Sequence, residues 1–196
     1  MFAKCDVTQD EDFKGAWDAA EENLGPVNVL INNAGIGNEK KWELTLNINV
    51  GGYIRGTMLA LERLGRNQNG SGGTVINISS VAGVKPVPFG PVYCATKYAI
   101  VGFTRAMGHD LHLARTGVKI QALCPSLVKT DLLTDSVKNA ISPEVGAAMA
   151  KYAEGLKEMT VETVAGALVK LLTEGKSGAC MVVEAEKEPY YVNDSV

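Results

Sequence analysis

The sequence predicts an α/β fold in which a doubly wound parallel sheet carries helices on both faces. Short runs rich in β-branched residues alternate with longer stretches of helical spacing, and Gly, Pro or Asn bounds each short run. Parallel neighbours in a sheet need a crossover connection, which is usually a helix. Because 46% of the 196 residues are apolar and 21% are charged, the chain can enclose one core. We therefore expect a single domain over residues 1–196.

Four short runs predict buried strands, and four longer stretches predict helices. The strands are expected at residues 28–35, 73–80, 118–125 and 178–184, and the helices at residues 10–24, 42–64, 92–114 and 160–172. Residues 127–155 contain helical patches interrupted by Ser142-Pro143 and Gly146, so we expect a loop with one or two short helices, a candidate lid. In such folds ligands bind at the carboxyl ends of the strands. The segments at these ends are NNAG (32–35), NISS (77–80), CPSLVKT (124–130) and the opening residues CDV (5–7).

Charge and hydropathy exclude two classes of partner. The chain has 22 acidic and 19 basic residues, a net charge of -3, and the two signs are mixed along its length. No block of basic residues could follow a phosphate backbone, so nucleic acid is excluded as a partner. No apolar run is long enough to cross a bilayer, and the start MFAKCDVTQDED lacks the features of a signal peptide. We expect a cytoplasmic protein without a membrane span.

The cysteines and histidines form no pattern typical of a disulfide framework or a metal site. The four cysteines are far apart and form no C-x-x-C pair, which is typical of buried apolar residues in a reducing compartment; they are Cys5, Cys94, Cys124 and Cys180. His109 and His112 lie three residues apart, but no third ligand pattern lies nearby. We expect these histidines on an exposed helix face and expect no metal.

Tyr93 and Lys97 lie four residues apart in PVYCATKYAIVGF (91–103), a stretch that is otherwise mostly small or apolar. Residues at i and i+4 lie on one side of a helix, so the phenol and the ammonium should face the same space. A nearby positive charge stabilises a phenolate, so we expect Lys97 to lower the pKa of Tyr93 from about 10 and to make it a usable acid/base. Ser80, at the end of a predicted strand, can hydrogen-bond a substrate oxygen. Taken singly, each pattern also occurs by chance, because Y-x-x-x-K is frequent on solvated helices and Ser79-Ser80 can simply begin a turn.

A combination of patterns in fixed order resembles the short-chain dehydrogenases/reductases, which are Rossmann-fold enzymes that use a nicotinamide cofactor. The matching residues run from residue 5 to the last predicted strand: Asp6-Val7, N-N-A-G at Asn32 to Gly35, Asn49, Ser80, the Y-x-x-x-K of Tyr93 and Lys97, and P-S-L-V-K-T at Pro125 to Thr130. Tyr93 follows Ser80 by thirteen residues, as in that family. The resemblance implies a Rossmann-type doubly wound sheet and dehydrogenase activity.

Carried over residue by residue, the resemblance implies a set of catalytic, cofactor and substrate contacts. Tyr93 would be the acid/base, Ser80 would orient and polarise the substrate oxygen, and Lys97 would lower the tyrosine pKa and bind the nicotinamide ribose. Asn49 would hold a water in a proton relay behind Lys97. The implied cofactor contacts are Cys5, Asp6, Val7, Asn33, Ala34, Gly35, Tyr93, Lys97, Val128 and Thr130. The implied substrate contacts are Ser80, Gly90 and Tyr93.

Within the family, the strongest resemblance is to the members that use NAD to oxidise the 15-hydroxyl of prostaglandins and related hydroxy-lipids. The matching segments are CDV, NNAGIGNEKKWE, LNINVGGYIRGT, PVYCATKYAIVGFTR and GACMVVEAEK. Two positions depart from those members. Pro125-Ser126 stands where the family usually has P-G, and serine is compatible provided that its backbone does not need the angle that demands glycine. Gly90 stands where those members carry a substrate-facing glutamine, so we expect a different substrate range.

The sequence does not contain the glycine-rich turn T-G-x-x-x-G-x-G, with which the family binds the cofactor pyrophosphate. The opening residues MFAKCDV resemble the third strand of the family, so the sheet is expected to lack the first two strand–helix units, roughly sixty residues. We therefore expect a fragment of a working dehydrogenase that is less stable than its parent and binds the cofactor poorly. The acidic residue that selects NAD over NADP would also be missing, and NAD is implied by the resemblance.

Two alternatives stay open beside this hypothesis. Helices 42–64 and 92–114 form the dimer interface in many members of the family, so the resemblance implies a homodimer through them. A truncated, inactive chain could instead serve as the dimer partner of a full-length subunit. Alternatively, the chain is a member that acts on a different alcohol or carbonyl substrate. Co-purification with a full-length homologue without turnover would favour the first alternative, and a substrate panel would test the second.

Overall fold

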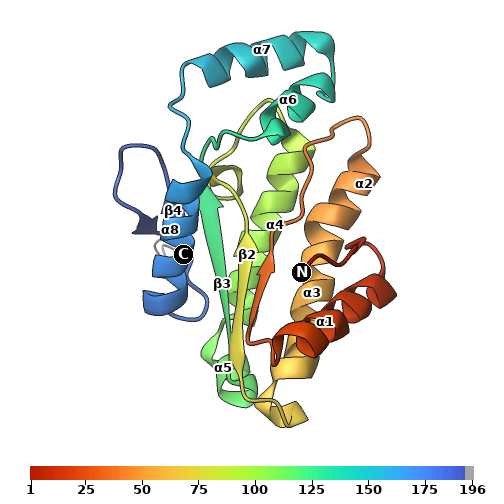
Figure 1. Ribbon diagram of the computed structural model, residues 1–196. Helices are drawn as coiled ribbons and strands as arrows, with labels where there is room; N and C mark the ends of the chain where they lie inside the picture. Colours follow the sequence, from red (N-terminus) through yellow and green to blue (C-terminus); the bar gives the residue numbers. More distant parts are fainter. Residues whose placement is uncertain (193–196) are drawn as a thin grey trace.

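Five strands form one sheet in the order β1-β2-β3-β4-β5 in the computed structural model, which describes residues 1–192 (Figure 1). They are β1 (Val29–Asn32), β2 (Gly73–Ile78), β3 (Val118–Pro125), β4 (Cys180–Val183) and β5 (Tyr190–Tyr191). Neighbours from β1 to β4 pair in parallel, and β5 pairs antiparallel with β4. The predicted α/β fold with a mostly parallel sheet is confirmed, and the short antiparallel β5 is an addition that the sequence pattern does not predict.

Within residues 1–192, eight α-helices connect and cover these strands. They are α1 (Asp10–Leu24), α2 (Trp42–Leu46), α3 (Tyr53–Leu64), α4 (Pro91–Met107), α5 (Asp110–Thr116), α6 (Asp131–Lys138), α7 (Pro143–Glu154) and α8 (Val161–Glu174). A π-helical segment (Asn47–Gly52) joins α2 to α3, and two short 3-10 turns lie at Arg66–Gln68 and Val81–Gly83. The two short helices α6 and α7 confirm the expectation for residues 127–155. Among residues 1–192, none of the helices combines the length and the apolar character needed to cross a bilayer.

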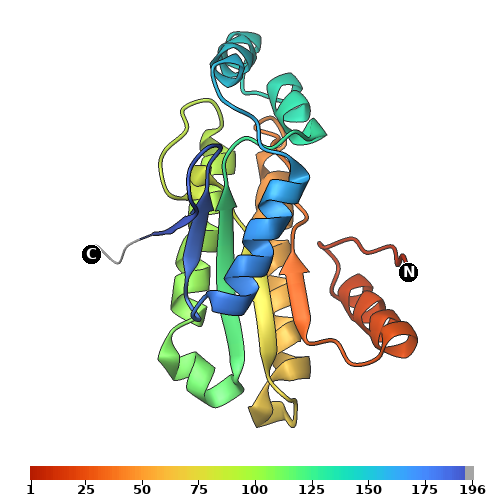
Figure 2. The same cartoon turned by 60° about the vertical axis from the view of Figure 1, so that its left-hand side comes forward.

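The strands alternate their side chains between two helical layers. On one face, Val118 and Ile120 of β3 pack against Leu59 of α3 and Trp17 of α1. On the other face, Leu123 of β3 packs with residues of α8. Figure 2 shows α8 lying across one side of the sheet, with α3 and α4 on the other. Nearly continuous burial along β3, with helices on both faces, is the arrangement expected of a central parallel strand.

A row of buried polar side chains holds α3 and α4 to the sheet. Asn32 at the end of β1 donates from Nδ2 to Oδ1 of Asn77 on β2 (2.9 Å) and to Oγ1 of Thr57 on α3 (3.3 Å). Asn77 in turn donates from Nδ2 to Oγ1 of Thr104 on α4 (3.0 Å). Because each of these groups would be costly to bury unpaired, the row fixes how both helices lie against the strands.

Two predicted helices are interrupted. The helix predicted at 42–64 widens into the π-helical segment, and the helix predicted at 92–114 ends at Met107, before α5 begins at Asp110. At Gly108 an added Cβ would lie 2.2 Å from the backbone N of Gly178, so the chain passes too close to the loop before β4 for a larger residue. This close approach depends on a distant segment, which is why helical spacing alone predicts a continuous helix.

The strand predicted at the opening residues is wrong, because residues 1–8 form no strand. A strand needs a neighbour for its backbone N–H and C=O groups. Within the described chain β1 pairs with β2 along one side, and no residue of the range 1–192 pairs along its other side. Val29 and Ile31 of β1 are 36% and 44% exposed, as fits a strand at the edge of the sheet. The opening residues instead lead directly into α1.

Candidate active site

Ser80, Tyr93 and Lys97 meet beyond the carboxyl end of β2, at the end of the sheet toward which its parallel strands point and near which α6 and α7 lie (Figure 1). Tyr93 and Lys97 come from the first two turns of α4, and Lys97 Nζ lies 5.5 Å from the centroid of the Tyr93 ring. The Ser80 hydroxyl lies close enough to the Tyr93 phenol to favour the phenolate. It also accepts the N–H of Ala82 (3.1 Å) and donates to the carbonyl of Pro125 (3.4 Å). The spacing from which the sequence predicts this cluster therefore brings the three side chains together.

Lys97 is a buried cation that is 4% exposed. Its Nζ donates to the carbonyl oxygen of Ile78 at 2.8 Å, and the same oxygen accepts the hydroxyl of Tyr53 at 2.9 Å. The ammonium also lies 5.3 Å from the centre of the Tyr53 ring, a cation–π distance. Burial disfavours the charged form and lowers the pKa of Lys97 to about 8. These contacts hold the lysine in one place, and its ammonium group loses its proton at mildly alkaline pH.

The pKa of Tyr93 is raised to about 12, the opposite of the direction that the Y-x-x-x-K spacing predicts. Burial is the largest cause, because the phenolate loses its hydration, and the hydrogen bond from Ser80 opposes the rise in part. The expectation treats Lys97 as a full charge acting on an otherwise ordinary phenol. In the structure both side chains are removed from water. The free energy lost when the phenolate is buried is larger than the free energy that its polar neighbours contribute.

Asn49 lies in the π-helical segment, and its side chain hydrogen-bonds the loop after β1. Its Oδ1 accepts the N–H of Ile36 (2.9 Å), and its Nδ2 donates to the carbonyl of Ile36 (2.8 Å) and to Oγ1 of Thr96 (3.1 Å). Thr96 Oγ1 in turn donates to the carbonyl of Tyr93 at 2.7 Å. The Asn49 side chain thus links the NNAG loop to the backbone of Tyr93, and π-helical segments are frequent at functional sites. Sequence reasoning missed Thr96, which carries no local signal beyond its place inside Y-x-x-x-K.

Glu39 is a second residue that sequence reasoning missed. Its side chain is buried at the start of α4, where Oε2 accepts the N–H of Val92 and Oε1 accepts the N–H of Tyr93, both at 2.9 Å. Residues 39 and 92 are 53 positions apart, so no periodicity connects them. Because the partners of this carboxylate lie at no regular spacing from it in the sequence, only the folded structure identifies it.

Three of the ten implied cofactor contacts line one small cavity beside β1. The cavity has a volume of about 140 Å³, and Val7, Asn33 and Ala34 lie in its wall together with Phe13 and Tyr53. An apolar cavity of this kind suits a flat aromatic ring, with the Asn33 side chain available for a polar contact. The described residues here fit the adenosine end of a nicotinamide cofactor. Gly35 lies closer to the reactive groups, because a Cβ added to it would be 3.8 Å from Lys97 Nζ.

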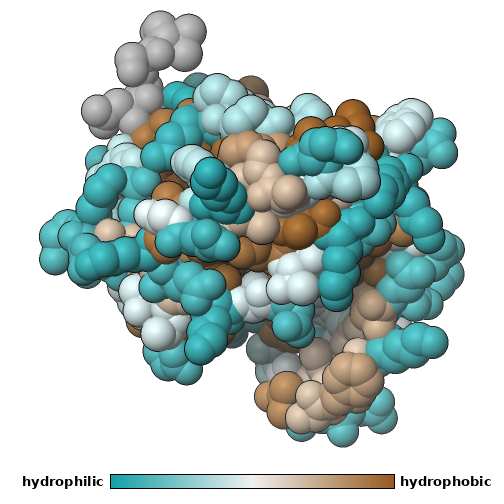
Figure 3. Space-filling model, turned by 90° about the horizontal axis from the view of Figure 1, so that it is seen from above, coloured by the Kyte–Doolittle hydropathy of each residue, from teal (hydrophilic) through white to brown (hydrophobic). Residues whose placement is uncertain are grey.

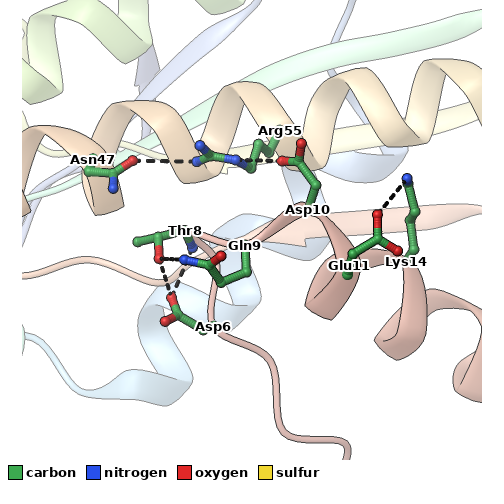
Figure 4. Close-up of polar contacts among 8 residues, drawn as sticks. All are labelled: Asp6, Thr8, Gln9, Asp10, Glu11, Lys14, Asn47 and Arg55. Atoms are coloured by element: carbon green, nitrogen blue, oxygen red, sulfur yellow. Dashed lines mark hydrogen bonds and ion pairs between the residues drawn. The ribbon is translucent and has the colours of Figure 1, made fainter.

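Asp6 turns away from this cavity. Its carboxylate oxygen Oδ1 accepts the N–H (2.9 Å) and the hydroxyl (2.8 Å) of Thr8, which closes a turn before α1 (Figure 4). These two hydrogen bonds lower the pKa of Asp6. Cys5 precedes this turn and is partly buried, and neither Cys5 nor Asp6 is in the wall of the cavity. The structure therefore groups Val7 with Asn33 and Ala34 and leaves Cys5 and Asp6 outside that cavity.

The loop after β3 holds the remaining implied contacts. Val128 forms an isolated parallel bridge with Met159, and Lys129 N–H donates to the Met159 carbonyl at 3.0 Å. Thr130 is exposed and precedes α6. Ser126 donates its N–H to the Val183 carbonyl (2.8 Å) and is not among the described non-glycine residues with positive φ. Serine at this position therefore needs no glycine-like backbone angle.

Apolar side chains are exposed around α6 and α7. Phe89, in the loop before α4, contacts Tyr152 of α7 with ring centres 5.2 Å apart. Ile141 is 63% exposed and Tyr152 54% exposed. Viewed from this end, brown apolar atoms lie among teal polar side chains (Figure 3). Gly90 is buried beside this loop at φ -139°, and an added Cβ would meet Glu39 Oε1 at 3.4 Å, so the backbone does not require glycine.

Sequence comparisons with known proteins all match dehydrogenases. A sequence model of the short chain dehydrogenase family matches residues 1–140. The rat (Rattus norvegicus) 15-hydroxyprostaglandin dehydrogenase (NAD(+)) is 35% identical over an alignment of 195 residues, which covers 95% of this chain and 72% of the rat enzyme. The human (Homo sapiens) enzyme of the same name is 42% identical over 133 residues, 68% of this chain and 50% of the relative. Alcohol dehydrogenase 1 of Ceratitis capitata is 39% identical over 131 residues, 67% of this chain and 51% of the relative.

Proposed function

This chain belongs to the short chain dehydrogenase family, and from that premise we propose that it oxidises a secondary alcohol to a ketone with NAD. The observation that carries the proposal is the meeting of Ser80, Tyr93 and Lys97 at the carboxyl end of the sheet, where the Ser80 hydroxyl favours the Tyr93 phenolate. A phenol, a hydroxyl and an ammonium in one half-buried place are suited to moving a proton to and from a substrate oxygen.

In the proposed reaction, Tyr93 takes the hydroxyl proton of the alcohol. Ser80 hydrogen-bonds the substrate oxygen, and the Lys97 ammonium favours the phenolate that accepts the proton. A bound nicotinamide cofactor would supply the hydride acceptor for the carbinol hydrogen. Asn49 has its side-chain amide committed to Ile36 and Thr96, so a proton relay through this residue would use its backbone carbonyl.

The proposed cofactor contacts follow the grouping of residues around the sheet. Val7, Asn33 and Ala34 would hold the adenosine end in the cavity beside β1, and Gly35 would lie near the ribose that Lys97 binds. Val128 would meet the nicotinamide carboxamide through its backbone, with Thr130 nearby. The proposal of NAD over NADP is supported by the rat and human relatives, whose names specify NAD(+).

For the substrate we propose a hydroxy-lipid, such as the 15-hydroxyl of a prostaglandin. The names of the rat and human relatives support this class, and so do the exposed apolar side chains of α6 and α7 next to the site. A panel of a 15-hydroxyprostaglandin, a hydroxysteroid and a short secondary alcohol, each with NAD and with NADP, tests the proposal through the absorbance of the reduced cofactor. The hydroxyprostaglandin with NAD is expected to give the highest kcat/KM. A higher value for the short alcohol would favour the activity named for the Ceratitis relative.

We also propose a homodimer in the cytoplasm that pairs through residues 42–64 and 92–114. Exposed apolar side chains on these helices support such a contact, among them Trp42 (51% exposed), Met58 (53%) and Tyr98 (42%). Light scattering coupled to gel filtration checks it. A mass of twice 20.8 kDa is expected, and a monomer at micromolar concentration would contradict the dimer.

Ser80→Ala is expected to lower kcat/KM for the alcohol by about 10²-fold, because one donor to the developing oxyanion is lost. The loss of the hydrogen bond from Ala82 N–H costs about 1 kcal/mol of folding free energy, so the variant should stay folded. Steady-state rates and thermal unfolding measure the two effects. Ser71→Ala, in an exposed loop, is the matched control. Equal rates for the two variants would contradict the role of Ser80.

A further inference from the structure

The carboxylate of Glu39 is buried on the backbone of Tyr93. Oε1 accepts the N–H of Tyr93 and Oε2 accepts the N–H of Val92, each at 2.9 Å. Glu39 is 7% exposed. A carboxylate in such a place must be compensated by hydrogen bonds or positive charge, and here the compensation comes from the first turn of α4. The proposed proton transfer makes no use of this acid, so its retention in the interior needs another reason.

Helix α4 begins without a cap of its own. Gly90 at the N-cap has no side chain, and Pro91 at the first helical position has no N–H. The next two N–H groups, on Val92 and Tyr93, are those that a capping side chain normally accepts from. The positive end of the helix dipole also favours a carboxylate. Glu39 therefore caps α4 from 53 residues away, where most helices use a neighbouring Ser, Thr, Asp or Asn.

Glu39 is itself held in place. Its backbone N–H donates to the carbonyl of Asn139 at 3.0 Å, and Nζ of the next residue, Lys40, donates to the carbonyl of Lys138 at 3.0 Å. Both acceptors lie at the carboxyl end of α6, where free helix carbonyls favour donors. The loop that carries Glu39 is thus joined to α6 on one side and to α4 on the other. Hydrogen bonds to α6 therefore hold the backbone of Glu39 in place while its carboxylate contacts Tyr93.

The other end of the Tyr93 peptide is also held. Its carbonyl accepts Oγ1 of Thr96 at 2.7 Å, and Thr96 accepts Nδ2 of Asn49 at 3.1 Å. Glu39 supplies the matching contact on the N–H side. Because the Tyr93 side chain extends from this stretch of backbone, a displacement of the backbone moves the hydroxyl relative to Ser80 and Lys97.

We propose that Glu39 is a positioning residue that fixes the first turn of α4 and thereby the Tyr93 phenol. The inference rests on the proposed function, because it concerns the placement of the proposed acid/base. Glu39 touches neither substrate nor cofactor in this role. Its removal should lower kcat more than the affinity for the cofactor, because three of the proposed cofactor contacts, Val7, Asn33 and Ala34, lie beside β1 and not on α4.

Glu39→Gln is the informative variant. The amide has the shape of the carboxylate, but its oxygen can accept one N–H while its NH₂ group faces the other N–H as a second donor. Glu39→Ala removes both acceptors and serves as the stronger variant. Glu43→Gln, an exposed glutamate in α2, removes one negative charge nearby and is the matched control. Each protein is compared for kcat, for KM of the cofactor and for hydrogen exchange of the peptide that contains Val92 and Tyr93.

Glu39→Gln is expected to lower kcat at least tenfold, to keep the cofactor KM within twofold and to speed the exchange of the Val92 and Tyr93 amides. Glu39→Ala should exceed it in both kcat loss and exchange, and Glu43→Gln should match the wild type. Unchanged exchange in Glu39→Gln, or faster exchange with unchanged kcat, would overturn the proposal. Absence of turnover in the wild type would contradict the proposed function itself, and this outcome is seen before any substitution is made.

Discussion

Tyr93→Phe is expected to lower kcat by about 10²–10⁴-fold, the factor that general acid–base catalysis typically contributes. Phenylalanine keeps the ring whose centroid lies 5.5 Å from Lys97 Nζ and loses the hydroxyl that lies beside Ser80. The cofactor KM should change little, because the cavity proposed for the adenosine end lies beside β1. Steady-state rates with the best alcohol of the panel measure the effect. Tyr98→Phe, an exposed tyrosine on the same helix, is the control. Turnover near the wild-type rate in Tyr93→Phe would show that another group takes the proton.

The wild type should also show a defined pH dependence, because the proposed base needs a phenolate beside a charged ammonium. With the pKa of Tyr93 raised to about 12, the phenolate fraction rises tenfold per pH unit across the neutral range. With the pKa of Lys97 lowered to about 8, the charged lysine fraction begins to fall tenfold per unit above that pH. The product of the two fractions rises up to about pH 8 and is level above it. A kcat/KM profile from pH 6 to 10 checks this, and a fall in kcat/KM from pH 6 to 8 would contradict it.

Lys97→Met is expected to lower turnover strongly and to leave the protein as stable as the wild type or more stable at pH 7. The charge that favours the Tyr93 phenolate is lost, so a rate loss of about a hundredfold or more follows. The buried ammonium costs folding free energy, because its pKa falls from 10.5 to about 8. At about 1.4 kcal/mol per pKa unit, this cost is about 3 kcal/mol at neutral pH. The Ile78 carbonyl keeps its hydrogen bond from Tyr53 when the lysine is removed.

The sign of the pH effect distinguishes this cause from simple packing. Between pH 8 and 10.5 the unfolded lysine binds a proton that the folded one has lost, so wild-type stability rises relative to Lys97→Met across this window. Below pH 8 the cost is fully present. Urea unfolding at pH 7 and pH 10 measures it, with Lys170→Met, an exposed lysine of α8, as control. A Lys97→Met protein several kcal/mol less stable at pH 7 would contradict the expectation.

The strands could be predicted because their signals are local. Runs such as VKIQALCP contain β-branched and apolar residues bounded by Gly and Pro, and β3 occupies the predicted range 118–125. The break after Met107 and the two-residue β5 could not be predicted in the same way. Gly108 ends α4 because the loop at Gly178 passes over it, and β5 exists because β4 offers a free edge. Both depend on contacts that form only once the sheet exists.

The residues of the site also divide into those with a local sequence signal and those that depend on distant contacts. The spacing of Tyr93 and Lys97 indicates a shared helix face, and the position of Ser80 after a strand indicates a shared edge, so their meeting follows from two periodicities. The pKa of Tyr93 does not follow, because it depends on how much water the folded chain removes. Glu39 does not follow either, because its partners are backbone N–H groups, which every sequence contains.

The π-helical segment at Asn47–Gly52 has a consequence for how the stretch 42–64 should be divided. An α-helix turns about 100° per residue, and a π-turn takes in one residue more than an α-turn, so the segment resets the angular phase between α2 and α3. Apolar positions before it and after it therefore do not belong to one stripe. Trp42 and Leu44 point outward while Leu59 and Leu64 face the core. If 42–64 were one α-helix, Trp42 would lie about 40° from Leu64 and so on the side that faces the core, whereas in the structure Trp42 is exposed.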